Sequence, residues 1–204
     1  MLEAILHGFV LAFGLILPLG AQNVFVFNQG ALQPTLLRAM PVVLTAALCD
    51  TLLILLAVLG VSLVVLTVTW LKTVLYVIGF FFLVYMGYLT WRSRPDTEAG
   101  EKERFSAKKQ IMFAASVSLL NPHAILDTIG VIGTSSLSYS GTEKWGFTVA
   151  CILVSCFWFF GLSVAGRTAG RLDRSGKLQR GLNMVSAVIM WGVAFYMAAQ
   201  LLIS

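Results

Sequence analysis

Two carboxylates lie inside long apolar runs and are the side chains best placed to bind a ligand. Asp50 is the only charged residue between Arg38 and Lys72, and Asp127 is the only one in residues 110–142. An ionised carboxylate at the centre of a bilayer costs about 3 kcal/mol on insertion scales. Because the lysines and arginines all sit in polar breaks or at the ends of apolar runs, neither carboxylate has an obvious basic partner. The remaining candidates for the partner of each carboxylate are a proton, a metal or alkali cation, and a cationic substrate. Alternatively, each carboxyl group is neutral and serves helix packing alone.

Two prolines place further polar groups near these carboxylates. Pro18 and Pro122 each remove a helical hydrogen bond and clash with the preceding turn, so we expect a break or kink at both. Freed backbone groups at membrane depth are tolerated only where protein buries them or where they line a wet cavity. The polar residues beside the breaks are therefore candidate substrate ligands: Gly20, Gln22, Asn23, Asn121 and His123. An ordinary kinked helix, whose amides only tie helices together, is the alternative.

An enzymatic interpretation has little support in the sequence. His123 and Asp127 are four residues apart and share a face on an unbroken helix, as a general base or half of a metal site would require. The other histidine is His7, no serine or cysteine motif accompanies the pair, and the three cysteines lie in apolar runs without ligand spacing. We expect no enzyme activity, no catalytic residues, no metal site and no cofactor. His123 is expected to orient substrate or to sense protons.

An aromatic cluster spans residues 156–160, which read Cys-Phe-Trp-Phe-Phe. Within it, Trp158 could stack on a guanidinium or ammonium group of a substrate. Packing or lipid contact is an equally good explanation of the cluster.

The composition requires a membrane protein. Hydrophobic residues make up 58% of the 204 residues and charged residues only 11%, which leaves too little polar surface for a soluble domain. Crossing the hydrocarbon core takes about 20 apolar residues. Six runs qualify, at about 3–28, 38–66, 71–91, 110–133, 142–166 and 181–202. We therefore expect an all-α integral membrane protein with six transmembrane helices, of which the first and fourth are broken.

The positive charges predict the orientation. Twelve of the 14 lysines and arginines lie in the breaks after the first, third and fifth runs, and only Lys72 and Lys144 lie on the other side. Basic residues in short loops stay in the cytoplasm, so both termini are expected outside. The formal charge of +5 then reflects membrane topology, and no nucleic acid is expected as a partner.

The two halves of the chain share a short pattern. Proline is followed five residues later by Asn23 in the first run and by Asp127 in the fourth, and the two prolines are 104 residues apart. Three spans between the copies would invert the second one, which gives the inverted repeat common among secondary transporters. We expect a first repeat at residues 1–91, a basic cytoplasmic loop at 92–109 and a second repeat at 110–204.

These residues together resemble the lysine/arginine exporter (LysE) superfamily of bacterial amino-acid efflux proteins, in its basic-amino-acid branch. The similarity covers essentially the whole chain in order, and Ala21 is one departure, because some relatives are expected to have proline there. It rests on the following segments: Leu17-Pro18-Leu19-Gly20-Ala21-Gln22-Asn23, Asn28-Gln29-Gly30, Cys49-Asp50, Leu120-Asn121-Pro122-His123, Asp127-Thr128 and Phe157-Trp158-Phe159-Phe160-Gly161.

The resemblance implies export of L-arginine or L-lysine across the bacterial cytoplasmic (inner) membrane, with H+ or Na+ as a possible coupling ion and a homo-oligomer as a possible assembly. One aspartate would pair with the cationic side chain and the other with the α-ammonium group or a coupling proton. The amides at the two breaks would take the α-carboxylate. A divalent-metal exporter, a homoserine/threonine exporter and a non-transporting membrane subunit stay open as alternatives.

Overall fold

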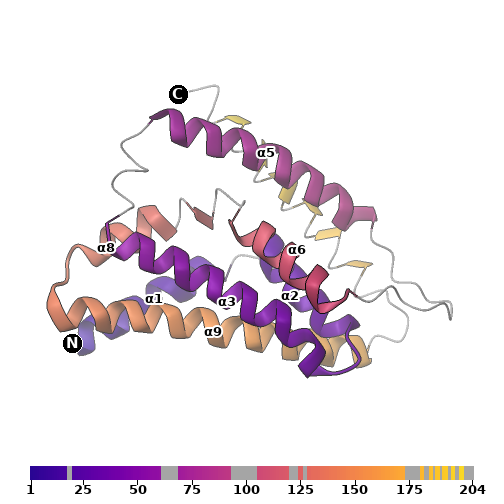
Figure 1. Cartoon of the computed structure of the whole chain (residues 1–204), viewed down its shortest axis with the longest axis horizontal. Helices are drawn as coiled ribbons and strands as arrows, with labels where there is room; N and C mark the ends of the chain where they lie inside the picture. The colour runs from indigo at the N-terminus through magenta and orange to yellow at the C-terminus, as the bar shows by residue number, and fades with distance from the viewer. Residues whose placement is uncertain are drawn as a thin grey trace.

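The computed structural model describes eight helical elements and short helical pieces near the C-terminus (Figure 1). The described residues are 1–17, 20–60, 69–92, 105–119, 124–125, 128–172, 180–181, 184–185, 187–188, 190–192, 194–195 and 198–199, and they contain no strand. The elements in chain order are α1 (Leu2–Ile16), α2 (Ala21–Leu32), α3 (Leu36–Val58), α5 (Thr69–Arg92), α6 (Ala107–Leu119), the π-helix η1 (Thr128–Gly133), α8 (Thr134–Ser136) and α9 (Gly141–Leu172).

The first apolar run is broken, as the sequence predicts. Helix α1 ends at Ile16, α2 begins at Ala21, and the two helices are bent by 80° at the break. At about 1.5 Å per residue α1 is about 22 Å long and α2 about 18 Å, so neither crosses a hydrocarbon core of about 30 Å alone. Pro18 lies outside the described residues.

The described helices of the fourth run are α6, which ends at Leu119, and the π-helix η1. A π-helix is a local disturbance of α-helical geometry that is frequent at functional sites. The predicted second break lies outside the described residues, together with Asn121, Pro122, His123 and Asp127.

Three predicted boundaries differ from the structure. Helix α9 does not end at Gly166 but continues to Leu172, so Arg167 and Arg171 lie in its last turns rather than in a loop. Helix α6 begins at Ala107, which places the last residues of the expected 92–109 loop inside a helix. Helix α3 ends at Val58, eight residues early, and Gly60 follows with a φ of +90° that side chains rarely adopt.

Two glycines near the end of α9 allow α2 to approach it closely. A Cβ atom on Gly166 would lie 2.0 Å from the Phe27 carbonyl oxygen, and one on Gly170 would lie 2.8 Å from that of Ala31. From the other side, a Cβ atom on Gly30 would lie 2.2 Å from the Ser163 carbonyl oxygen. Small residues that bring helix backbones together are typical of membrane interfaces. The last turns of α9 therefore pack against α2 at glycine positions.

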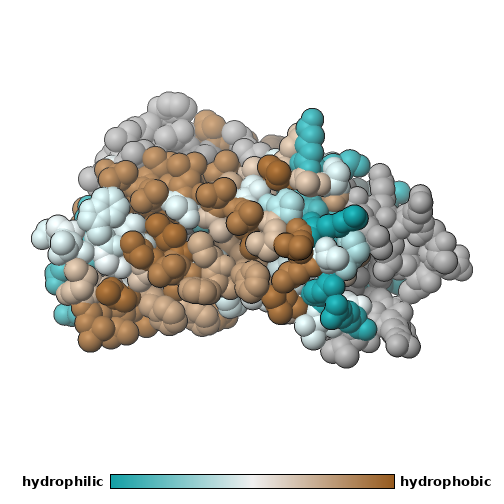
Figure 2. Space-filling model, turned by 60° about the horizontal axis from the view of Figure 1, so that its bottom comes forward, coloured by the Kyte–Doolittle hydropathy of each residue, from teal (hydrophilic) through white to brown (hydrophobic). Residues whose placement is uncertain are grey.

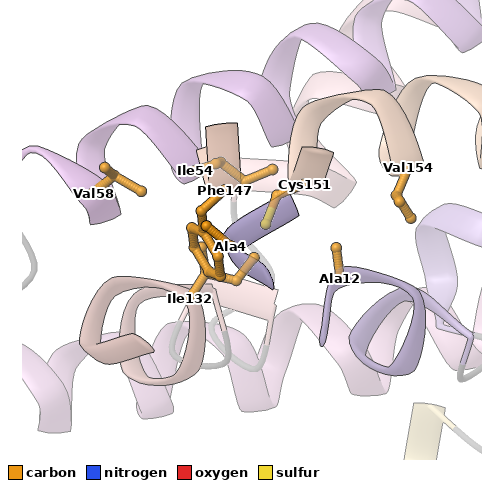
Figure 3. Packing of buried hydrophobic residues seen from close by; sticks show 8 residues of the cluster. All are labelled: Ala4, Ala12, Ile54, Val58, Ile132, Phe147, Cys151 and Val154. Atoms are coloured by element: carbon orange, nitrogen blue, oxygen red, sulfur yellow. The ribbon is translucent and has the colours of Figure 1, made fainter. Parts of the chain in front are cut away.

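Helix α9 joins the parts of the molecule by contacting α1, α2 and α3. A buried cluster at one end combines Ala4 and Ala12 of α1, Ile54 and Val58 of α3, Ile132 of η1, and Phe147, Cys151 and Val154 of α9 (Figure 3). A second cluster nearer the other end joins α2, α3, α6 and α9 around Val26, Val42 and Phe159. The broken first element is thus held along its length by one unbroken helix.

The outer faces of these helices are apolar. On α3, Leu44, Leu48 and Leu52 recur every four residues and are exposed, so one stripe of the helix points away from the protein. Figure 2 shows apolar residues spread over much of one face, with hydrophilic residues gathered towards one end. Among the described residues, α3 and α9 are long and apolar enough to cross a membrane, and the bent α1–α2 pair would be a third such span.

Charges mark the two ends of this bundle. At one end the N-terminal ammonium group pairs with Glu143 at the start of α9. At the other, the guanidinium group of Arg167 donates to the carbonyl oxygens of Gln33 and Pro34 at the turn before α3. The starts of α3 and α6 lie at this second end, because Gln110 of α6 donates to the Arg38 carbonyl oxygen. We call it the cationic end, after Arg38, Lys108, Lys109, Arg167 and Arg171.

Replacing Gly166 by alanine should destabilise the protein by about 1–3 kcal/mol, because the new methyl group meets backbone rather than a side chain that can turn away. Thermal unfolding of the purified protein in detergent measures the effect. Gly161→Ala is the matched control on the same helix, since nothing lies within 4 Å of its Cβ position. Equal melting temperatures for the two variants would contradict the close crossing of α2 and α9.

Candidate functional site

Three helices bring polar side chains to the Asp50 carboxylate. Gln22 of α2 donates from Nε2 to Asp50 Oδ1 at 3.2 Å, and Ser155 of α9 donates from Oγ to Oδ2 at 3.1 Å. Each carboxylate oxygen therefore receives one neutral donor and keeps acceptor capacity for another. Two neutral donors fix the orientation of the carboxylate without neutralising its charge.

The charge of Asp50 has no basic partner among the described residues. In that part of the chain the one ion pair joins the N-terminus to Glu143, at the outer edge of the molecule. No three His, Cys, Asp or Glu side chains come together there in a way that would hold a metal ion. Hard divalent cations take six or more oxygen ligands, and the described surroundings of Asp50 supply its carboxylate, one amide side chain and one hydroxyl group.

Asn23 lies one residue from Gln22 but acts on the helix break. Its Nδ2 donates to the Ile16 carbonyl oxygen at 2.8 Å, and its Oδ1 accepts from Trp158 Nε1 at 3.3 Å. Ile16 is the last residue of α1, where the helix leaves its final carbonyl groups without intrahelical donors. The buried Asn23 side chain thus supplies the donor that the interrupted backbone lacks.

Gly20 forms the other side of the break. It is the N-cap of α2 in an extended conformation, with no side-chain cap, and nothing lies within 4 Å of its Cβ position. The first backbone N–H groups of α2 start from this open position. N–H groups at a helix start favour an anionic group.

The aromatic side chains of residues 157–159 point in different directions. Phe157 is 72% exposed and Phe159 only 1%, which assigns the first to the outer surface and the second to the core. Trp158, expected to stack on a substrate, places its N–H on Asn23 and its ring edge-on to Phe13, with ring centroids 5.7 Å apart. Trp158 thus contacts the break through Asn23, the residue next to Gln22, which bonds to Asp50.

The structure brings Asp50, Gln22, Asn23, Gly20 and Trp158 into one region, where α1, α2, α3 and α9 meet. The other four candidates, Asn121, Pro122, His123 and Asp127, lie outside the described residues together with Pro18. Ser155 is the contact that sequence reasoning missed, because a serine in an apolar run is unremarkable. The signal that could have found it is the repeat, since an offset of 104 residues carries Asp50 to Val154, the neighbour of Ser155.

A bundle of apolar helices around a broken helix, with a carboxylate that has no basic partner in the part of the chain that the structure describes, is typical of membrane transporters. Comparison with known proteins places it more closely. The family model of the LysE type translocators matches residues 13–201. No solved structure matches.

Three curated relatives span nearly the whole chain. The "Putative amino-acid transporter YisU" of Bacillus subtilis (strain 168) is 58% identical over 98% of this chain and 91% of its own length. The "Arginine exporter protein ArgO" is 34% identical over 98% of this chain and 95% of its own length, both in Salmonella paratyphi A and in Salmonella typhimurium. The chain belongs to the LysE type translocator family, a family of transporters and not of enzymes.

Replacing Asn23 by alanine should destabilise the protein, because the Ile16 carbonyl group and the Trp158 N–H would both lose a partner. A buried polar group left unsatisfied costs about 1–3 kcal/mol. Trp158→Phe removes one donor and keeps the aromatic ring, so its effect should be smaller. Melting temperatures in detergent for both single variants and the double variant measure this, and an Asn23→Ala protein as stable as wild type would refute the role at the break.

Proposed function

We propose that the protein is a secondary active transporter that exports the basic amino acids L-arginine or L-lysine across the bacterial cytoplasmic membrane. The observation that carries the proposal is the Asp50 carboxylate, held by Gln22 and Ser155 and without a basic partner among the described residues. Family membership and the relatives named as arginine exporters support the substrate class.

Asp50 is proposed to bind the positive charge of the substrate. A guanidinium or ammonium group would restore the charge balance that the two neutral donors leave open, and hydrogen bonds between charged partners are about twice as strong as neutral ones. The α-carboxylate of the substrate is proposed to lie at the start of α2, beside Gly20, where backbone N–H groups favour an anion. The two ends of an amino acid would then contact adjacent helices.

Asn121, His123 and Asp127 are proposed to complete the site from the second half of the chain, with Asp127 at the α-ammonium group or at a coupling proton. This follows from the inverted repeat, which we propose for residues 1–91 and 110–204, with six spans in total and Pro18 and Pro122 at equivalent breaks. The contact between Asp50 and Ser155, next to its pseudo-symmetric position, supports this arrangement. H+ or Na+ is the proposed coupling ion, and a homo-oligomer the proposed assembly.

The proposed orientation places the cationic end in the cytoplasm and both termini outside. It is supported by the grouping of Arg38, Lys108, Lys109, Arg167 and Arg171 at one end of the bundle, opposite the N-terminus. Basic residues near short loops remain on the cytoplasmic side. Residues 92–109 would then belong to the cytoplasmic surface.

Asp50→Asn should reduce counterflow of radiolabelled arginine in proteoliposomes by at least about thirtyfold. The reason is that losing one partner of a buried charge pair costs about 2–5 kcal/mol. Glu143→Gln is the matched control, because it also neutralises a carboxylate but at the exposed N-terminal end. Wild-type counterflow in Asp50→Asn would overturn the proposed site. Exchange of neutral amino acids but not of arginine or lysine by the wild type would overturn the proposed substrate class.

Ser155→Ala should weaken the apparent affinity for arginine by about three- to tenfold while leaving transport measurable. The hydroxyl group contributes one hydrogen bond that orients Asp50, and such a bond is worth about 0.5–1.5 kcal/mol. Ser155→Thr should restore the affinity because it keeps the donor. Thr168→Ala is the control for hydroxyl loss from the same helix, since Thr168 is exposed and bonds to its own helix. Equal affinities in Ser155→Ala and wild type would exclude the orienting role.

A further inference from the structure

Three buried glutamines lie at the cationic end. Gln29, Gln33 and Gln110 are 3%, 5% and 1% exposed. Gln33 Nε2 donates to Gln29 Oε1 at 3.1 Å and to the Phe105 carbonyl oxygen at 3.0 Å. Gln110 Nε2 donates to the same Phe105 carbonyl oxygen and to that of Arg38, each at 3.0 Å. These bonds tie together α2, the start of α3, and the residues that lead into α6. We call this set the glutamine clamp.

Helix α9 closes the clamp from the remaining side. Arg167 donates to the carbonyl oxygens of Gln33 at 3.4 Å and Pro34 at 3.1 Å. These carbonyl groups belong to the turn after α2, where helical partners end. All four elements that surround the cationic end therefore meet through side-chain hydrogen bonds to backbone oxygens.

The clamp lies at the cationic end, and α2 and α3 lead from it to the region of Asp50. Two stretches of the chain connect the clamp to the region of Asp50. Gln33 at the end of α2 lies 11 residues after Gln22, and Arg38 at the start of α3 lies 12 residues before Asp50. At about 1.5 Å per residue the two regions are about 16–18 Å apart along these helices. Along α2 and α3 the clamp therefore lies on the side of Asp50 that faces the cationic residues.

The closed clamp is incompletely satisfied. Gln110 Oε1 is buried without a donor among the described residues, and so is Ser163 Oγ on the face of α9 that meets Gly30. Buried polar groups are nearly always paired, so each exception calls for an explanation. A closed state with unmet acceptors gains hydrogen bonds when water enters, which favours a clamp that opens over one that only stabilises the fold.

The chemistry of the clamp also suits a cationic cargo. Amides and backbone carbonyl groups are neutral, whereas a buried carboxylate in the same place would bind a cation and compete with Asp50. The glutamine bonds are neutral and each has a small net value, so they can break one at a time. The Arg167 bonds that close the clamp come from a cation, which does not attract a positive solute. The clamp can therefore close a passage without trapping a positive solute.

We propose that the glutamine clamp is the gate that closes the Asp50 site at the cationic end, and that the structure is in the state in which this gate is shut. Opening would separate Gln33 and Gln110 from the Phe105 carbonyl group and free α6 from the start of α3. The inference rests on the proposed function, because a gate requires a transported solute.

Cysteine accessibility tests the gate without any substrate. Cys49 adjoins Asp50 and is buried, so it serves as the reporter when Cys151 and Cys156 are replaced by alanine. A membrane-impermeant maleimide is added to sealed vesicles on the side of the membrane where the cationic end of the protein is exposed. Gln110→Ala removes two hydrogen bonds and should speed labelling of Cys49 by about tenfold or more, and Gln33→Ala should do the same. Ser116→Ala is the matched control, because Ser116 is an exposed residue of α6 that bonds only to its own helix.

The outcomes separate the gate from the proposed function. Faster labelling in both glutamine variants, from that face alone and not in Ser116→Ala, supports the gate. Unchanged labelling in a folded variant, checked by its melting temperature, overturns it, and so does equal acceleration from both faces, which would mean general loosening. Absence of arginine and lysine counterflow in the wild type would reject the proposed substrate and leave the labelling result standing.

Discussion

The rest of the structure depends on the satisfied backbone at the break between α1 and α2. Inside a bilayer, no water is available for a carbonyl group that a helix end leaves free, so protein must supply the donor. The bond from Asn23 Nδ2 to the Ile16 carbonyl oxygen does this, and Trp158 holds the amide in position. Because the break exists, Gln22 begins a new helix that turns towards α3, where it meets Asp50. Asn23 thus satisfies the carbonyl group at the end of α1, and its neighbour Gln22 contacts Asp50.

The second constraint is electrostatic. Gln22 and Ser155 orient the Asp50 carboxylate, and no basic side chain among the described residues pairs with its charge. A permanent basic partner would have made the site stable and inert, because a buried ion pair resists the loss of either member. In the proposed carrier, a carboxylate with neutral donors would pair with a substrate that can leave.

Much of this arrangement could be predicted from the sequence. A proline inside a helix and a charged residue inside a membrane each have a free-energy cost that can be recognised from the residue type alone. A proline in an apolar run predicted the break after α1, and the lone Asp50 drew attention to the place where Gln22 and Ser155 meet its carboxylate. Ser155 could not be predicted from its own type, since a serine side chain can also bond within its helix. The predicted end of α9 was wrong because the helix continues past the apolar run into a basic segment, and the crossing of Gly166 and Gly170 with α2 is revealed only by the packed structure. The glutamine clamp needed the same information, since its members come from helices far apart in sequence.

The glycine contact between α2 and α9 also bears on how these helices can move. Interlocked side chains form ridges and grooves that must climb over each other when two helices shift along their axes. At Gly30, Gly166 and Gly170 no such ridges exist, and backbone faces backbone. Shear between packed helices is one of the standard forms of conformational change. The crossing of α2 and α9 is therefore also a place where few side chains oppose a sliding movement of the two helices.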